Sequence, residues 1–130
     1  MSLKIASAVC LSAVLGVSAA DFDAGKLPPV AAKQGVTYEK DIKPLFERSC
    51  FKCHGAEKQK GKLRVDSLEA TLKGGENGAS VVKGDSLKSS LIVSISGLDS
   101  DTVMPPEGKG EPLTKEQVGI VRAWIDQGAK

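Results

Sequence analysis

The stretch Cys50-Phe51-Lys52-Cys53-His54 constrains the fold more than any other part of the sequence. Its two cysteines are spaced so that one short turn can present both thiols to the vinyl groups of a haem. The next residue, His54, is then placed to bind the haem iron on one axial side. The motif predicts covalent haem c on Cys50 and Cys53. Because this haem is attached outside the cytoplasm, we also expect the chain to be exported.

The first twenty residues have the pattern of a secretory signal peptide. One charge, Lys4, precedes an apolar run over residues 5–17, and Ser18-Ala19-Ala20 supplies small residues for cleavage. We therefore expect cleavage near Ala20 and a periplasmic or otherwise exported protein. A membrane anchor is the alternative, but the run is shorter than the roughly 20 residues that a bilayer requires. A lipoprotein modified at Cys10 is another alternative, although Cys10 lies inside the apolar run and too few apolar residues precede it to form the hydrophobic region of a signal.

Composition narrows the class of protein. The 130 residues include 18 Lys and Arg against 16 Asp and Glu, a net charge of +2, which indicates neither a strongly charged disordered chain nor a nucleic-acid-binding protein. This length allows one domain. Cleavage after Ala20 would leave a chain of 110 residues, and we expect this chain not to insert stably into a membrane. The processed chain keeps two cysteines, one histidine and one methionine, which are Cys50, Cys53, His54 and Met104.

Three other interpretations of the cysteine motif remain open. A disulfide between Cys50 and Cys53 is possible outside the cytoplasm, but it closes a very small loop and leaves His54 unexplained. A thioredoxin-like pair normally lies beside a βαβ pattern, which this sequence lacks. A closed structural zinc site needs four Cys or His ligands, and the processed chain has three.

A six-coordinate haem iron needs a second axial ligand, and the processed chain has no second histidine. Met104 stands before Pro105-Pro106 in a segment without apolar periodicity. The prolines restrict the backbone and can hold the approach of the thioether, so we predict Met104 as the distal ligand. Histidine and methionine together raise the haem potential, which suits electron transfer rather than catalysis. A buried methionine, lysine ligation and an open sixth position are the alternatives.

A basic run follows the motif, formed by Lys52, Lys58, Lys60, Lys62 and Arg64. A solvated loop is the simpler interpretation. The alternative hypothesis is that the run borders an exposed haem edge and steers an acidic redox partner.

Apolar spacing and capping residues predict four helices, with a loop over residues 51–65. They cover residues 38–49 with Thr37 as cap, residues 67–72 with Asp66 as cap and Gly74 as end, residues 86–96 after Asp85, and residues 115–127 with a capping box of Thr114 and Gln117. A strand over residues 91–93 is the alternative for the third. Residues 21–36 have no sustained period and are expected to be a flexible lead-in to a domain over residues 37–130.

These residues resemble the class I c-type cytochromes, and among them the planctomycete-type cytochrome c domain. The similar segments are residues 38–45, 50–55, 63–67, 74–78, 84–86, 90–92, 104–106 and 124–129. The motif at 50–54 is common to c-type cytochromes, so the glycine pair, Met104-Pro105-Pro106 and the ending at 124–129 carry the narrower assignment.

The resemblance implies an all-α class I cytochrome c fold, with short helices around one covalent haem and the first and last helices packed together. It implies haem on Cys50 and Cys53, with His54 as proximal and Met104 as distal ligand. The expected function is transfer of single electrons between redox-partner proteins, and not catalysis. The alternatives are a haem sensor or small-ligand-binding module in which Met104 is displaced, and a non-haem metal or thiol redox protein.

Overall fold

Every regular element in the described part of the chain is helical. The computed structural model describes residues 22–130, so the expected signal peptide and Cys10 lie outside the described residues. The α-helices within this range are α1 (Lys43–Ser49), α2 (Leu68–Lys73), α3 (Ser90–Ser96) and α4 (Lys115–Asp126). Short turns are the 3-10 helices η1 (Ala24–Lys26), η3 (Lys60–Lys62) and η4 (Ser86–Lys88) and the π-helical η2 (Tyr38–Ile42). The all-α prediction is confirmed. Among the helices of residues 22–130, none has the length and apolar character needed to cross a membrane.

The first predicted helix forms as two joined parts. Thr37 caps it as expected, and its hydroxyl accepts a hydrogen bond from the N–H of Lys40 at 3.4 Å. In η2 the N–H of Lys43 donates to the carbonyl of Tyr38, five residues earlier, which makes this turn wide. Pro44 then lies in the first turn of α1, where its missing N–H has no helical partner to lose. The helix ends at Ser49, directly before the first cysteine.

α2 uses a different cap from the one predicted. Ser67, and not Asp66, accepts a hydrogen bond from the N–H of Ala70 at 3.1 Å. Asp66 instead accepts two hydrogen bonds from the guanidinium of Arg64, at 3.0 and 2.6 Å. A paired, charge-assisted contact of this kind is stronger than a single cap bond, so it holds Asp66 away from the helix.

The third predicted helix is interrupted at Ser89. The hydroxyl of Ser89 donates to the carbonyl of Asp85 at 2.9 Å, and this local bond competes with a continuous helix. η4 and α3 therefore form as separate elements. Leu87 is 51% exposed, although its spacing predicts a core position, whereas Ile92 and Ile95 are buried. The strand alternative for this segment is wrong, because residues 90–96 are helical.

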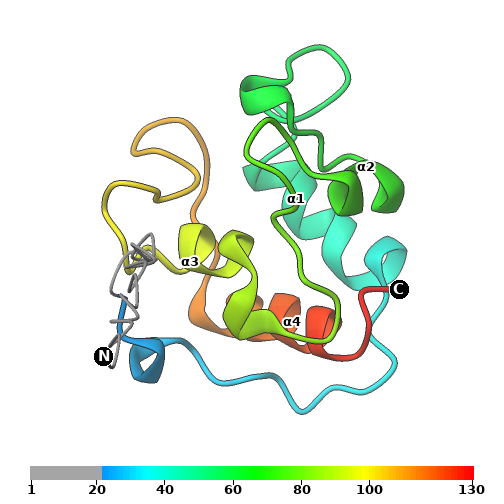
Figure 1. The fold of residues 1–130 in the computed structure, drawn as a ribbon, viewed down its shortest axis with the longest axis vertical. Coiled ribbons are helices and arrows are strands. Elements are labelled where there is room, and N and C mark those ends of the chain that lie inside the picture. The colour runs from blue at the N-terminus through cyan, green and yellow to red at the C-terminus, as the bar shows by residue number, and fades with distance from the viewer. Residues whose placement is uncertain (1–21) are drawn as a thin grey trace, which may run out of the picture.

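α4 matches its prediction and lies at the centre of the core. Thr114 and Gln117 form the capping box, with reciprocal bonds of 3.2 and 2.8 Å. The helix packs against η2, α3 and η4 (Figure 1). The ring centres of Tyr38 and Trp124 lie 6.1 Å apart, so the first and last helices are in contact. The largest fully buried side chains are Trp124, Tyr38, Phe46, Ile42, Ile92, Ile125, Val118 and Val121.

Residues 22–36, called the strap below, correspond to the lead-in that the sequence predicts, and in the structure they lie against the helical domain. The strap runs along α4 (Figure 1), and its Leu27 is buried in the core. The N–H of Ala31 donates to the carbonyl of Gly119 at 3.0 Å, and the side-chain amide of Gln127 donates to the carbonyl of Lys33 at 2.7 Å. Polar groups of α4 thus bind the backbone of the strap, an arrangement that leaves no periodic pattern in the strap itself.

Gly119 brings the strap close to α4 and is the place to test this packing. A Cβ atom at position 119 would lie 2.6 Å from the carbonyl oxygen of Pro29, closer than van der Waals contact allows. Gly119→Ala gains about 1 kcal/mol of helix propensity, but overpacking of this kind costs about 1–3 kcal/mol. We expect a lower melting temperature and faster proteolysis within the strap. A variant stabilised by the full propensity gain would contradict close packing here.

Candidate functional site

The four predicted site residues line one cavity of about 560 Å³. Cys50, Cys53 and His54 come from the turn after α1, and Met104 comes from the segment between α3 and α4. The remaining walls come from the end of α1, the loop with η3, residues 75–80 and α3. The fold therefore joins at one cavity two segments that are about fifty residues apart in the sequence.

The end of α1 continues directly into the cysteine turn. The N–H of Cys50 donates to the carbonyl of Phe46 at 2.7 Å, as a last helical bond. The N–H groups of Cys53 and His54 then donate to the carbonyl of Cys50, at 3.1 and 2.9 Å. These bonds close one compact turn, so both thiols and the imidazole line the same cavity, as the motif predicts.

Cys50 and Cys53 are free thiols in the structure. Burial raises the pKa of the Cys50 thiol to about 12, and the neighbouring Cys53 adds to this. A reactive redox cysteine needs the opposite shift, because the thiolate is the nucleophile. Within residues 22–130, His, Cys, Asp and Glu side chains form no group of three or more that could hold a metal ion. Neither the thiol redox nor the non-haem metal alternative is supported.

The ring of His54 is held by a backbone group. Its Nδ1 lies 3.2 Å from the carbonyl oxygen of Leu63. A carbonyl can only accept, so Nδ1 carries the proton and donates, and Nε2 of the neutral ring keeps a lone pair for a metal. The N–H of Val65 also donates to the carbonyl of His54 at 2.9 Å. The loop between residues 54 and 65 thus selects the tautomer that an iron ligand needs.

Leu63 is a functional position that sequence reasoning missed. Only its backbone carbonyl takes part, and any residue type supplies a carbonyl. Tyr38 holds the same part of the loop, because its buried hydroxyl donates a hydrogen bond to the carbonyl of Val65. Burial raises the pKa of this phenol to about 12, so it stays a neutral donor. The one signal in the sequence for this contact is the presence of a tyrosine, Tyr38, at the start of the predicted helix over residues 38–49.

Met104 is held by its backbone and remains partly open to solvent. Its N–H donates to the carbonyl of Ser94 in α3 at 2.9 Å. The residue is 39% exposed and lines the cavity. Pro105 and Pro106 also line the cavity, beside the thioether that they were expected to position.

The cavity fits a large, mainly apolar cofactor. Its volume lies within the roughly 300–1,000 Å³ of pockets that enclose such ligands. The apolar part of the wall consists of Phe46, Leu63, Val65, Leu91 and Ile95. Ser80 on the wall carries a buried hydroxyl with no hydrogen-bond partner within residues 22–130. Two thiols, an imidazole and a thioether are the donor set that covalent haem c uses.

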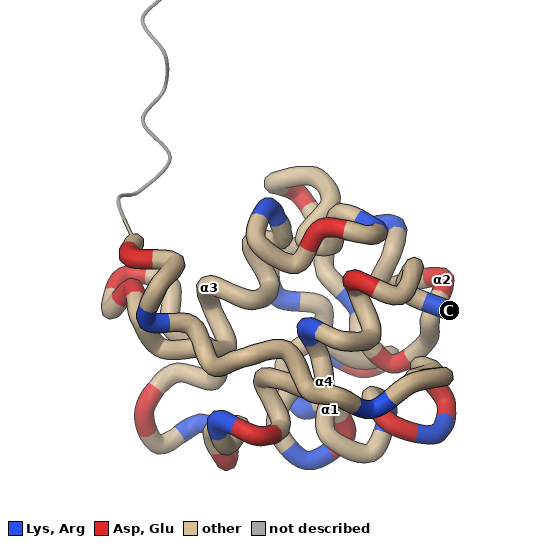
Figure 2. The backbone as a smooth tube through the Cα atoms, turned by 90° about the horizontal axis from the view of Figure 1, so that it is seen from below, with Lys and Arg blue, Asp and Glu red and all other residues tan. Residues whose placement is uncertain are grey.

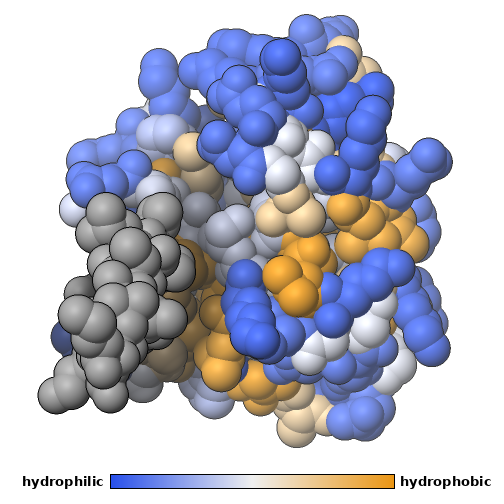
Figure 3. All heavy atoms as spheres, viewed as in Figure 1, coloured by the Kyte–Doolittle hydropathy of each residue, from blue (hydrophilic) through white to orange (hydrophobic). Residues whose placement is uncertain are grey.

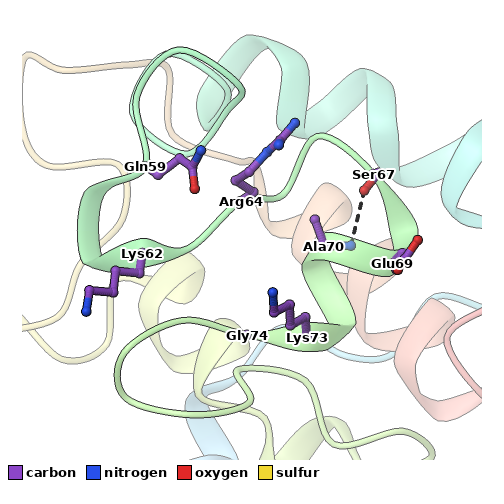
Figure 4. A pocket seen from close by; sticks show the side chains of 8 residues that line it. All are labelled: Gln59, Lys62, Arg64, Ser67, Glu69, Ala70, Lys73 and Gly74. Atoms are coloured by element: carbon purple, nitrogen blue, oxygen red, sulfur yellow. Dashed lines mark hydrogen bonds between the residues drawn. The ribbon is translucent and has the colours of Figure 1, made fainter.

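A second cavity, of about 350 Å³, lies between η3 and α2 (Figure 4). Its lining residues are Gln59, Lys62, Arg64, Ser67, Glu69, Ala70, Lys73 and Gly74. It contains no thiol, imidazole or thioether, and the Lys62 side chain extends away from the other lining residues. It is a polar surface hollow, unlike the first cavity.

Comparison with known proteins identifies the same region. Residues 50–108 match the model of a family described as Planctomycete cytochrome C. The match begins at Cys50 and ends just beyond Met104, so it spans all four site residues but not the first and last helices, to which the resemblance extends. The chain matches no curated protein and no solved structure. The family implies covalent haem c and haem-based electron transfer, with which Cys50 and Cys53 are consistent. The match therefore assigns residues 50–108 to the planctomycete cytochrome c domain, and proteins with such a domain are typically electron carriers.

Proposed function

We propose that this protein is an exported c-type cytochrome with one haem, which carries single electrons between redox-partner proteins. The observation that carries the proposal is the convergence of Cys50, Cys53, His54 and Met104 on one cavity. The haem, when bound, supplies an iron that cycles between Fe(II) and Fe(III). The protein's part is to hold this group, exclude water from it and set its potential.

Each of the four side chains has a distinct role in this proposal. Cys50 and Cys53 hold the haem through thioether bonds. His54 provides the proximal nitrogen, with its orientation fixed by the Leu63 carbonyl. Met104 provides the distal sulfur, a weak donor that favours Fe(II) and so raises the potential. Filled positions on both sides of the iron suit a carrier, which has no substrate to bind.

Export is part of the proposal and rests on residues 1–20, which precede the described residues. Mass spectrometry of the mature protein from the periplasmic fraction tests it. We expect an N-terminus near Asp21 and the added mass of one haem. An unprocessed chain without haem would contradict the proposal.

The substitution Met104→Ala tests the distal ligand. We expect loss of the near-infrared band of methionine bound to ferric iron. The midpoint potential should fall by on the order of 0.1–0.2 V, since axial ligands set haem potentials over about 0.8 V. Lys109→Ala, at another cavity-lining position, serves as the matched control and should keep the band. An unchanged spectrum in Met104→Ala would assign the iron to another ligand.

A second candidate function is a haem sensor in which a small ligand displaces the Met104 thioether. The exposed segment over residues 106–112, which follows Met104, favours this candidate, because an exposed segment opens more easily than a buried one. Carbon monoxide added to the ferrous protein distinguishes the two candidates. A carrier keeps the spectrum of its methionine-ligated ferrous form at low carbon monoxide concentration, whereas a sensor converts readily to the carbon monoxide complex.

Removal of the haem tests how much the fold depends on it. The wall residues Phe46, Leu91 and Ile95 face a cavity that the haem would fill, and unfilled apolar cavities destabilise a protein. We expect the double variant Cys50→Ser, Cys53→Ser, produced without haem, to show weak helical circular dichroism. A cooperative thermal transition with full helical signal would show that the core around Trp124 suffices alone.

We propose the lysines beside the haem cavity as the surface that meets an acidic redox partner. Lys52 and Lys60 line that cavity, and Lys73 lies nearby on the second one. Arg64 is paired with Asp66, so lysines carry most of the free positive charge of the basic run. Hydrophilic residues cover the loop with η3 (Figure 3), while Lys and Arg alternate with Asp and Glu over much of the chain (Figure 2). Any steering must therefore be local.

Small oxidants of opposite charge test this surface without a known partner. We expect ferricyanide to oxidise the ferrous protein more slowly as salt rises, and hexaammineruthenium(III) more rapidly. Lys60→Glu should lower the ferricyanide rate about two- to tenfold at low salt, within the range of electrostatic steering. Lys26→Glu, on η1 and outside the cavity lining, is the control. Equal effects of the two variants would contradict local steering.

A further inference from the structure

The segment that carries Met104 is attached at two ends. At residue 104 the backbone N–H bonds to Ser94 of α3 at 2.9 Å. At residue 111 the backbone carbonyl of Glu111 accepts a hydrogen bond from the hydroxyl of Ser49 at 2.5 Å. Ser49 is the last residue of α1 and directly precedes Cys50. One side chain thus ties the segment of the proposed distal ligand to the cysteine turn.

Close packing reinforces the second attachment. A Cβ atom at Gly110 would lie 3.0 Å from the carbonyl oxygen of Ser49 and 3.2 Å from the Cβ of Pro105. Gly110 therefore lies between the end of α1 and the ring of the proline that follows Met104. A side chain at position 110 has to displace one of these two neighbours. Since Ser49 belongs to a helix, the more easily displaced neighbour is Pro105.

Burial contributes little to the position of this segment. Residues 106–112 are exposed. Within the segment, the N–H of Lys109 donates to the carbonyl of Pro106 at 3.0 Å, which forms a turn but adds no link to the rest of the protein. An exposed segment with few buried apolar contacts opens readily unless specific bonds hold it. The hydrogen bond of the Ser49 hydroxyl and the close packing at Gly110 are the interactions that hold this segment.

We propose that Ser49 and Gly110 are positioning residues that hold the Met104 thioether against the haem iron. The proposal rests on the proposed function, in which Met104 is the distal ligand. Ser49 acts through the backbone of Glu111, and Gly110 acts through Pro105. Ser49 directly precedes Cys50, the first of the two cysteines proposed to hold the haem. Its bond to Glu111 therefore fixes the position of the Met104 segment relative to the haem attachment point.

Cyanide binding to the ferric holoprotein measures how often the thioether leaves the iron. At saturating cyanide the rate follows opening of the methionine segment. We expect Ser49→Ala to raise this rate about fivefold, which is the effect of one hydrogen bond worth about 1 kcal/mol. The near-infrared band of methionine ligation should also be lost at a lower temperature. Ser49→Thr keeps the hydroxyl and should restore both values.

Gly110→Ala is the second variant, and it leaves every hydrogen-bonding group in place. Its expected result is also faster cyanide binding and a weaker methionine band, because Pro105 is displaced. The matched control is Ser67→Ala at the start of α2, which removes a hydroxyl that accepts a hydrogen bond from the backbone N–H of Ala70 at 3.1 Å. This control should lower thermal stability without changing cyanide binding.

Met104→Ala separates failure of this inference from failure of the distal-ligand assignment. If Met104→Ala leaves the band and the cyanide rate unchanged, Met104 is not the ligand, and both that assignment and this inference fail. If Met104→Ala removes the band while Ser49→Ala and Gly110→Ala match Ser67→Ala, the ligand assignment stands and the positioning role is overturned.

Discussion

The hydrogen bond between Nδ1 of His54 and the carbonyl of Leu63 is the interaction on which the site depends. It fixes the ring and leaves Nε2 free, so the only histidine of the chain is prepared as a metal ligand. This requires the loop of residues 54–65 to close back on the cysteine turn. The backbone bond from Val65 to His54 closes it, and the Tyr38 hydroxyl attaches it to the first helix. Tyr38 in turn packs on Trp124 of α4. His54, the proposed proximal ligand, is thus connected to the centre of the core by three consecutive contacts.

The sequence predicts well those features that local chemistry determines. The capping box of Thr114 and Gln117 and the apolar stripe of α4 both depend on residues within one or two helical turns, and both are found. The spacing of Cys50, Cys53 and His54 likewise fits one short turn. The prediction of Met104 as the second ligand rests on a residue count, because Met1 lies in the expected signal peptide and Met104 is the other methionine of the sequence. No sequence pattern indicates that Met104 lies close to the cysteine turn.

The features that the sequence does not predict depend on competition between distant or alternative partners. Asp66 can cap a helix or pair with Arg64, and the ion pair prevails. Ser89 can continue a helix or bond back to Asp85, and it interrupts the helix. The strap has no periodicity because its backbone is bound by side chains of α4, nearly a hundred residues away. The acceptor at Leu63 is a backbone group, so its residue type carries no information about its role.

The two sides of the cavity are built differently, and this difference bears on function. His54 lies on a loop closed by backbone bonds and attached to buried aromatic residues. Met104 lies on a segment that is mostly exposed and reaches the rest of the protein through few polar contacts. A disturbance of equal size therefore displaces the distal side first, since its contacts are fewer and less buried. A carrier gains from this asymmetry only if the distal segment stays closed during electron transfer, whereas a sensor gains when it opens. The strength of the polar contacts at the two ends of that segment therefore determines which of the two behaviours this fold supports.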